Sequence, residues 1–369
     1  MGLATEDGSL PNDHVPFGAY GGERQALIDY TKPMRGGPID HGFDTYFGDD
    51  VPNFPPYTWF ENDRLQQAPS VPKPDEMFGA AGDMVPDWKL EEVMPELTRR
   101  AVSYVEEADE TPFFLYFPLT ASHTPIVPLG RFAGMSAAGD YGDYVCEVDW
   151  CLGQVLDALE RTGQRQNTLL VFTSDNGPEH FAYERIREHG HYSMGDLRGL
   201  KRDAWEGGHR VPFLASWPAG QVSSRAGSTC EQLTPLGDLW ATVAELAESQ
   251  VPENGGEDSV SIVPLLHSAG PVCDCAVHHS MQGKFALRRG EWVLIDAPTG
   301  GDNDEPEWLQ AERGYEMHDC PGELYDLRED LLQRKNRYTE RPQLVAKMRE
   351  LLEQVQAGKN QGLAGAETL

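Results

Sequence analysis

An acid and an amide stand together where an apolar run ends. The segment "LLVFTSDNG" places Asp175 and Asn176 directly after residues that favour a β-strand. Carboxylate and amide oxygens are the ligands that Ca²⁺ and Mg²⁺ prefer, although these ions take six or more oxygens. The same two residues, followed by Gly177, could equally form a turn. From spacing alone, a cation site and a turn are equal alternatives.

A cationic, Gly-rich segment follows, "LRGLKRDAWEGGHRVPF". Lys201 carries a compact charge on a flexible stem and could bind an anionic group. Glu206 and Arg210 flank two glycines where backbones could approach closely, and we expect them to form an ion pair or hydrogen-bonded brace for this loop. His123 follows another apolar run and could donate a hydrogen bond to the same anion or protonate a leaving oxygen. Taken singly, a lysine such as Lys201 is more often an ordinary surface residue. A histidine such as His123 more often has its hydrogen bonds satisfied within the protein.

Composition limits the partners. The chain has 369 residues, 39% of them hydrophobic, and carries 60 Asp and Glu against 30 Lys and Arg, a net charge of -30. Such a field repels nucleic acids and anionic membranes, so we expect neither as a partner. An anionic small substrate would need a local cationic pocket.

Cysteine spacing and the first residues exclude two further classes. The six cysteines lack the spacing of a disulfide scaffold or a zinc site, so we expect ordinary thiols. The N-terminal residues show neither a basic region followed by an apolar one nor the pattern of a signal peptide. No apolar run reaches the roughly 18 residues of a membrane span. The chain as given therefore indicates no export signal and no membrane span.

Apolar periodicity predicts the elements that must position these residues. A first helix is expected from apolar residues three and four apart, Leu97, Ala101, Val105 and Ala108. A second helix is expected from the same spacing in Val145, Val148, Leu152, Val155 and Leu159. Apolar runs at residues 113–119 and 169–173 predict strands that follow these helices, the first buried on both faces. This order predicts an α/β fold with a parallel sheet whose strand ends collect the functional groups.

The two ends of the chain differ from its middle in composition and hydrophobic pattern. The first ninety or so residues are rich in Gly and Pro, which predicts ordered loops with short strands. After residue 270, "KFALRRGEWVLIDAP" predicts a hairpin, "GELYDLRED" a strand and "RPQLVAKMRELLEQVQAG" a terminal helix with one apolar stripe. We therefore expect a catalytic domain over residues 1–270 and an antiparallel α+β subdomain over residues 271–369.

Taken in order, these motifs resemble the sulfatase family, and most closely its arylsulfatase branch. "FTSDNG" and "LRGLKRDAWEGGHRVPFLASWP" carry the resemblance, and "GFDTYFG", "PFFLYFPLTASHTPIVP" and "ALRRGEWVLI" extend it over nearly the whole chain. It implies an alkaline-phosphatase-like sandwich, hydrolysis of sulfate esters, and a sulfated small molecule or glycan as substrate. By the same resemblance, Asp175 and Asn176 match ligands of the family's Ca²⁺, and Lys201 and His123 match residues that contact the sulfate.

One departure from the family matters more than the agreement. Sulfatases attack sulfur with a formylglycine made from Cys or Ser in a C/S-x-P-x-R motif, and this sequence contains no such motif. Two acidic metal ligands of the family's first strand and its G-K-x-H segment are missing too, and we expect Asp49 and Asp50 to form a turn, not to replace them. The resemblance therefore implies the C-terminal part of a sulfatase, whether from a truncated gene, a mis-called start codon or a split enzyme. Because it lacks its nucleophile, we expect the chain to be inactive alone, and a complementing N-terminal segment could be its partner. Family members are commonly periplasmic, secreted or lysosomal.

Two alternatives stay open at this point. The chain could be a non-catalytic relic that binds sulfated glycans or a partner protein, which the missing nucleophile motif favours. It could also be a related phosphoryl-transfer hydrolase with a Thr or Ser nucleophile and two zinc ions. The scarcity of His and Asp clusters at zinc spacing argues against the second alternative.

Overall fold

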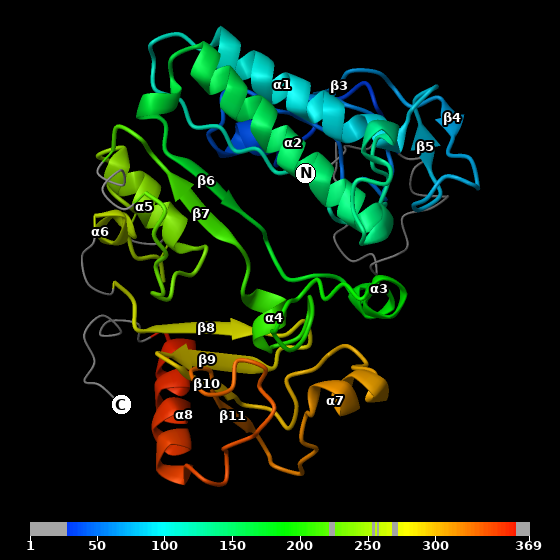
Figure 1. Ribbon diagram of the computed structural model, residues 1–369. Coiled ribbons are helices and arrows are strands. Elements are labelled where there is room, and N and C mark those ends of the chain that lie inside the picture. Colours follow the sequence, from blue (N-terminus) through cyan, green and yellow to red (C-terminus); the bar gives the residue numbers. More distant parts are fainter. Residues whose placement is uncertain (1–27, 221–225, 253–254, 257, 268–271, 359–369) are drawn as a thin grey trace. The chain divides into compact units, whose positions relative to one another are not determined.

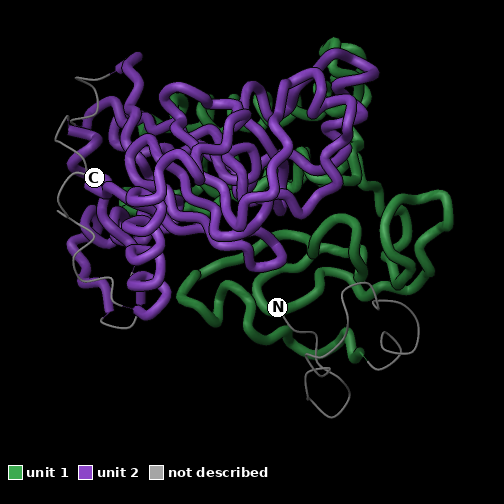
Figure 2. The backbone as a smooth tube through the Cα atoms, turned by 90° about the horizontal axis from the view of Figure 1, so that it is seen from below, with its two compact units in different colours: residues 1–164 green, residues 165–369 purple. Residues whose placement is uncertain are grey.

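The computed structural model describes residues 28–220, 226–252, 255–256, 258–267 and 272–358. The chain divides into two compact units, residues 1–164 and residues 165–369 (Figure 2). Two long helices dominate unit 1, and a four-stranded antiparallel sheet lies at the C-terminal end of unit 2 (Figure 1). None of the described helices is long and apolar enough to cross a membrane.

The N-terminal part of unit 1 consists of loops and two-residue strands, as its Pro and Gly content predicted. The short elements of unit 1 are η2 (Pro38–His41), β1 (Phe47–Gly48), β2 (Phe60–Glu61), β3 (Arg64–Leu65), β4 (Val71–Pro72), β5 (Asp83–Met84), η3 (Leu90–Glu92) and η4 (Gly130–Phe132). Strands β1, β2 and β3 form one antiparallel sheet, and β4 pairs with β5.

The first predicted helix is confirmed as α1 (Val93–Glu107). Leu97, Ala101 and Val105 are buried along one face of it, and Ala108 lies just beyond its last residue. That apolar face packs against the second long helix, α2 (Gly139–Arg161).

The buried face of α2 matches the prediction in its second half, where Val155 and Leu159 are buried, but differs from it by about one residue in the first half. Val145 is 43% exposed, whereas Tyr144 and Cys151 are buried and pack with Met94 of α1. Neighbouring residues of a helix point about 100° apart, so α1 can cover Tyr144 and leave Val145 in solvent. Spacing predicted the helix correctly, but the position of α1 decided which side of it is buried.

The strand predicted at residues 113–119 is absent. No strand or bridge is assigned to this segment. Exposure alternates along it, since Phe114 is 59% and Tyr116 68% exposed while Phe113, Leu115 and Phe117 are half-buried. The prediction of a strand buried on both faces is therefore wrong, because no described strand pairs with the segment.

Unit 2 begins with a pair of strands that lead into the Gly-rich segment. β6 (Leu170–Thr173) confirms the second predicted strand, but it pairs with β7 (Phe213–Ser216) in antiparallel register. Thr173 lies opposite Phe213, so the chain re-enters the sheet at the end where it left. The expected parallel pairing is wrong for these strands because it needs a connection that crosses back over the sheet.

The other elements of unit 2 include the predicted C-terminal hairpin, strand and helix. They are η5 (Arg165–Asn167), α3 (Ala182–His189), α4 (Glu206–His209), α5 (Asp238–Leu246), α6 (Val263–Leu266), β8 (Cys275–His279), β9 (Phe285–Arg289), β10 (Trp292–Ile295), α7 (Glu307–Arg313), β11 (Glu323–Asp326) and α8 (Pro342–Gln356). The C-terminal sheet has the antiparallel order β11-β10-β9-β8, so the predicted α+β arrangement is confirmed.

Both faces of the C-terminal sheet are covered. Leu287, Leu294 and Leu324 pack on one face with the apolar stripe of α8. The opposite face packs against Ala204 and Trp205, which directly precede α4. Successive strand residues point to opposite faces, so one short sheet buries two apolar layers. Figure 1 shows α8 and α4 beside this sheet.

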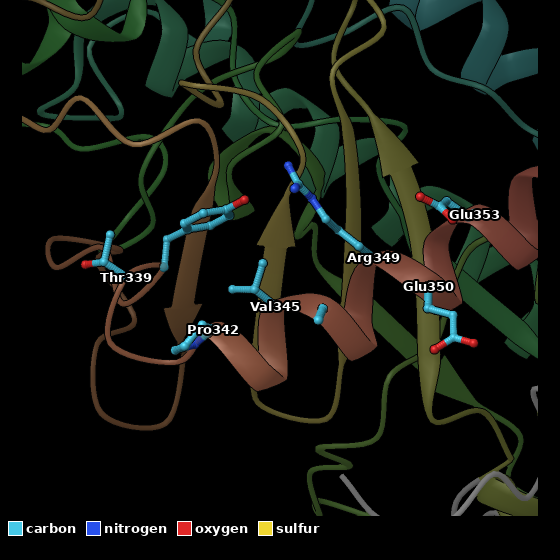
Figure 3. A pocket seen from close by; sticks show the side chains of 8 residues that line it. Thr339, Pro342, Val345, Arg349, Glu350 and Glu353 are labelled. Atoms are coloured by element: carbon cyan, nitrogen blue, oxygen red, sulfur yellow. The ribbon is translucent and has the colours of Figure 1, made fainter.

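A groove runs beside α8 (Figure 3). Pro342, Val345 and Arg349 line it along the helix. The Arg349 guanidinium donates to the Asp296 carboxylate at 2.8 Å. None of the residues singled out from the sequence as functional lies in this groove.

The packing of Trp205 gives a first prediction. Trp205→Ala should lower the free energy of unfolding by about 3–5 kcal/mol, because the side chain is 2% exposed and its removal leaves a cavity. Trp240→Ala is the matched control, since Trp240 is 56% exposed, and it should cost less than about 1 kcal/mol. Urea unfolding of both variants measures the difference. Equal losses would contradict the assigned role of Trp205.

Asp49 gives a second prediction. Burial raises the pKa of the Asp49 carboxyl to about 7, and the Asp50 charge adds to this. The native state therefore binds this proton more tightly than the unfolded state, and the free energy of unfolding should fall as pH rises from about 4 to about 7. Asp49→Asn should remove this dependence and stabilise the protein at pH values above about 7.

Urea unfolding at several pH values between about 5 and 8 tests this expectation. Asp44→Asn, an exposed carboxyl of the same loop region, is the control for the loss of one charge. A wild-type stability that stays level over this range would show that the Asp49 carboxyl is already ionised in the native state.

Candidate functional site

The end of β6 forms the turn that the sequence allowed. The Asp175 carboxylate accepts the Asn176 N–H at 3.0 Å, and the Asn176 amide nitrogen donates to the Gly177 carbonyl at 2.9 Å. Asp175 is exposed and Asn176 half-buried. No described residue donates a hydrogen bond to Asp175 Oδ2 or Asn176 Oδ1. The turn therefore leaves two oxygens available to a ligand, so the two interpretations of these residues are compatible.

Lys201 lies in a second turn, next to the first. The Asp203 N–H donates to the Leu200 carbonyl at 3.0 Å and closes the turn. The Lys201 N–H donates to the Pro178 carbonyl at 2.9 Å, and the Lys201 carbonyl accepts from the Asn303 side chain at 2.8 Å. The Lys201 ammonium forms no hydrogen bond or ion pair with the described residues. The structure thus brings the Lys201 backbone beside the loop that follows Asn176.

Glycines allow these two loops to touch. The Gly177 N–H donates to the Gly208 carbonyl at 3.0 Å. A Cβ atom on Gly177 would lie 1.8 Å from the Gly207 carbonyl oxygen, and one on Gly207 would lie 2.2 Å from the Gly199 carbonyl oxygen. Any larger residue would therefore force the loops apart. The close backbone approach expected at the two glycines after Glu206 is confirmed.

The predicted ion pair between Glu206 and Arg210 is present and is part of a larger group. Arg210 Nε donates to Glu206 Oε2 at 2.7 Å, and Arg288 of β9 donates to the same oxygen at 3.0 Å. The Glu206 N–H donates to the Gln333 side chain at 2.9 Å. Glu206 is buried, so it needs these partners. It joins α4 to the C-terminal sheet as well as bracing its own loop.

Arg198 is a structural residue that the sequence did not reveal. Its guanidinium donates two hydrogen bonds to the Glu305 carboxylate, at 3.2 and 2.8 Å, and both side chains are buried. Its Cζ lies 3.9 Å from the ring centroid of Trp205 and 4.2 Å from that of Tyr315. Burial raises the pKa of Glu305, and the Arg198 charge opposes this rise. The pair is 107 residues apart in sequence, so no local pattern could have indicated it.

His123 belongs to unit 1 and is exposed. Its Nδ1 lies 2.6 Å from the Thr124 carbonyl oxygen. A carbonyl only accepts hydrogen bonds, so Nδ1 carries the hydrogen and Nε2 is the nitrogen left for a ligand. Lys201 and the Asp175 turn belong to unit 2, so a meeting of His123 with them stays a prediction.

The residues at the end of β6 fit a divalent cation in chemistry but not in number. Asp175 and Asn176 supply hard oxygen ligands, of which such an ion needs six or more. In the described ranges no group of three or more His, Cys, Asp or Glu side chains could hold a metal. Asp50 accepts the Val51 N–H at 2.8 Å, but neither Asp49 nor Asp50 is assigned to a turn, so the turn expected there is not confirmed. All six cysteines are free thiols, as expected.

Comparison with known proteins identifies the family. The family model for Sulfatase matches residues 18–249, which contain both turns. An N-acetylgalactosamine-6-O-sulfatase of Bacteroides thetaiotaomicron is 33% identical over 278 residues, which are 73% of this chain and 52% of that protein. Human arylsulfatase D is 37% identical over 185 residues, which are 49% of this chain and 30% of that protein. The chain spans about half the length of these relatives, or less.

Solved structures agree with this assignment. A Bacteroides thetaiotaomicron protein from a locus for glycosaminoglycan metabolism has a TM-score of 0.74 and 26% identity, covering 89% of this chain and 76% of that one. A protein solved with its substrate D-glucosamine-2-N,6-O-disulfate has a TM-score of 0.59 at 17% identity, covering 86% and 77%. The fold is the alkaline-phosphatase-like fold of sulfatases, with a small antiparallel C-terminal sheet, as expected. With 232 of its 369 residues matched, the chain belongs to the sulfatase family.

Proposed function

We propose that this chain supplies the cation-binding and sulfate-binding part of a sulfatase of the arylsulfatase type, and that the attacking group comes from a segment outside this sequence. One observation supports the proposal most directly. The Lys201 N–H donates to the Pro178 carbonyl at 2.9 Å, two residues after Asn176. A free ammonium group and two free oxygens thus emerge from adjoining turns of unit 2.

The chain's own residues would bind and orient the sulfate group. The Lys201 ammonium would donate a charge-assisted hydrogen bond to a sulfate oxygen and stabilise the negative charge that grows there. Asp175 and Asn176 would supply two of the oxygen ligands of the divalent cation that the family uses, a Ca²⁺ by resemblance. When bound, that ion neutralises charge on the sulfate oxygens. His123 would present Nε2 to the leaving oxygen and, when its ring carries a proton on both nitrogens, would donate a hydrogen bond or that second proton from Nε2.

Several observations support a sulfated sugar or aryl sulfate as the substrate. The named relatives are an N-acetylgalactosamine-6-O-sulfatase and an arylsulfatase, and one structural neighbour holds a disulfated glucosamine. In a chain with a net charge of -30, an anionic substrate needs a cation that is not already neutralised, and Lys201 is such a cation within the described residues.

The missing nucleophile motif supports inactivity of this chain alone. The exposure of Phe114 and Tyr116 supports a complementing segment, because large side chains on that stretch of unit 1 are left uncovered. A non-catalytic sulfate-binding relic would share the sulfate site, and the absence of a C/S-x-P-x-R motif favours it as the second candidate.

Sulfate binding without turnover is the expected behaviour. In buffer containing Ca²⁺, the chain should bind inorganic sulfate, and Lys201→Ala should weaken this binding by at least about tenfold, because a hydrogen bond to a charged group is lost. Lys347→Ala, an exposed lysine of α8, should leave the affinity unchanged. Calorimetric titration measures all three proteins, and 4-nitrophenyl sulfate release measures turnover.

The outcomes separate the parts of the proposal. Equal sulfate affinity in wild type and Lys201→Ala would refute the assignment of the sulfate site. Release of 4-nitrophenol by the chain alone, lost in Lys201→Ala, would show that the nucleophile is present after all. Turnover gained only when an N-terminal sulfatase segment is added would support the proposed enzyme over the relic.

A further inference from the structure

Arg202, the residue after Lys201, has an unusual backbone. In the turn from Leu200 to Asp203 it holds the third position, with φ of +86°. Turns with a positive φ at this position favour glycine there. This conformation is strained for a residue with a Cβ atom and persists only where its surroundings impose it.

The Arg202 side chain joins the two turns of the candidate site. Its guanidinium forms a two-pronged ion pair with Glu179, with Nη1 on Oε1 and Nη2 at 2.9 Å from Oε2. Glu179 comes three residues after Asn176. Burial alone would raise the pKa of Glu179, but Arg202 and His180 outweigh it and lower the pKa to about 2. The carboxylate is therefore charged at neutral pH, and the ion pair is complete.

Hydrogen bonds also hold the Lys201 turn on the side away from the loop after β6. The Arg202 carbonyl accepts the Met281 N–H at 2.9 Å. The buried Asp203 carboxylate accepts the N–H groups of Leu200, Asp302 and Asn303 at 2.7 to 2.9 Å. These contacts fix the turn against the C-terminal part of unit 2. The Glu179–Arg202 pair is the side-chain link from the turn to the loop after β6.

We propose that Arg202 and Glu179 are positioning residues for Lys201. Their ion pair fixes the Lys201 turn against the loop that carries Asp175 and Asn176, and so sets where the ammonium meets a sulfate oxygen. The inference rests on the proposed function of Lys201 as a sulfate ligand. Arg202 acts through Lys201, because both terminal nitrogens of its guanidinium, Nη1 and Nη2, already donate to Glu179.

A double-mutant cycle tests this inference, with inorganic sulfate in Ca²⁺ buffer as the probe. Arg202→Ala should weaken sulfate binding by about three- to tenfold, and Glu179→Gln by a similar factor, because a misplaced ammonium loses part of a charged hydrogen bond. Adding Arg202→Ala to Lys201→Ala should cause no further loss. Arg328→Ala, an arginine 75% exposed and paired with Glu291, is the control and should leave affinity unchanged.

Arg202→Gly separates positioning from a general effect on folding. Glycine suits φ of +86°, so this variant should unfold at a urea concentration equal to or higher than that of Arg202→Ala. It should still lose the same three- to tenfold in sulfate affinity, because the ion pair is gone. If instead the more stable of the two variants also binds sulfate more tightly, the loss of affinity reflects stability and the inference is overturned.

The other possible outcomes of these experiments also test the inference. Normal sulfate affinity in Arg202→Ala and Arg202→Gly would overturn the positioning role of Arg202. It would leave the proposed role of Lys201 as a sulfate ligand intact. A further loss when Arg202→Ala is added to Lys201→Ala would mean that Arg202 binds sulfate itself. No effect of Lys201→Ala would instead refute the proposed function, on which the inference rests.

Discussion

The burial of Trp205 against the C-terminal sheet is the interaction on which the rest of unit 2 depends. Its ring packs with Ala286, Val293 and Ile295, and its Nε1 donates to Glu323 at 2.8 Å. Burying an aromatic side chain contributes several kcal/mol, whereas an exposed ion pair contributes about 1 kcal/mol or less. The sheet therefore anchors the Gly-rich segment, and the polar contacts around Lys201 adjust the position of an already anchored turn.

Ion pairing distinguishes one cation of the Gly-rich segment from the others. Arg198 pairs with Glu305, Arg202 with Glu179, and Arg210 with Glu206. In the described residues, Lys201 alone among the cations of this segment up to Arg210 has no such partner. The acidic chain thus neutralises the arginines that hold the loops together and leaves an ammonium for a ligand. This is the local exception that a strongly negative protein needs if it is to bind an anion.

The rest of the fold is consistent with a site that is only partly supplied by this chain. Two free oxygens at the end of β6 are too few for a divalent cation, and the stretch around Phe114 and Tyr116 exposes large side chains. In the described residues, β6 and β7 form a two-stranded sheet, which is smaller than typical α/β sheets.

The sequence by itself determined what local spacing encodes. It predicted α1, α8 and the C-terminal hairpin from their periods, the position of Asp175 at a strand end, and the pairing of Glu206 with Arg210, which are one helical turn apart. Only the tertiary structure decided the antiparallel entry of β7, the exposed side of α2, and the partners of Arg198 and Arg202. Those features depend on contacts between residues that are far apart in the sequence. Periodicity within one segment does not predict such contacts.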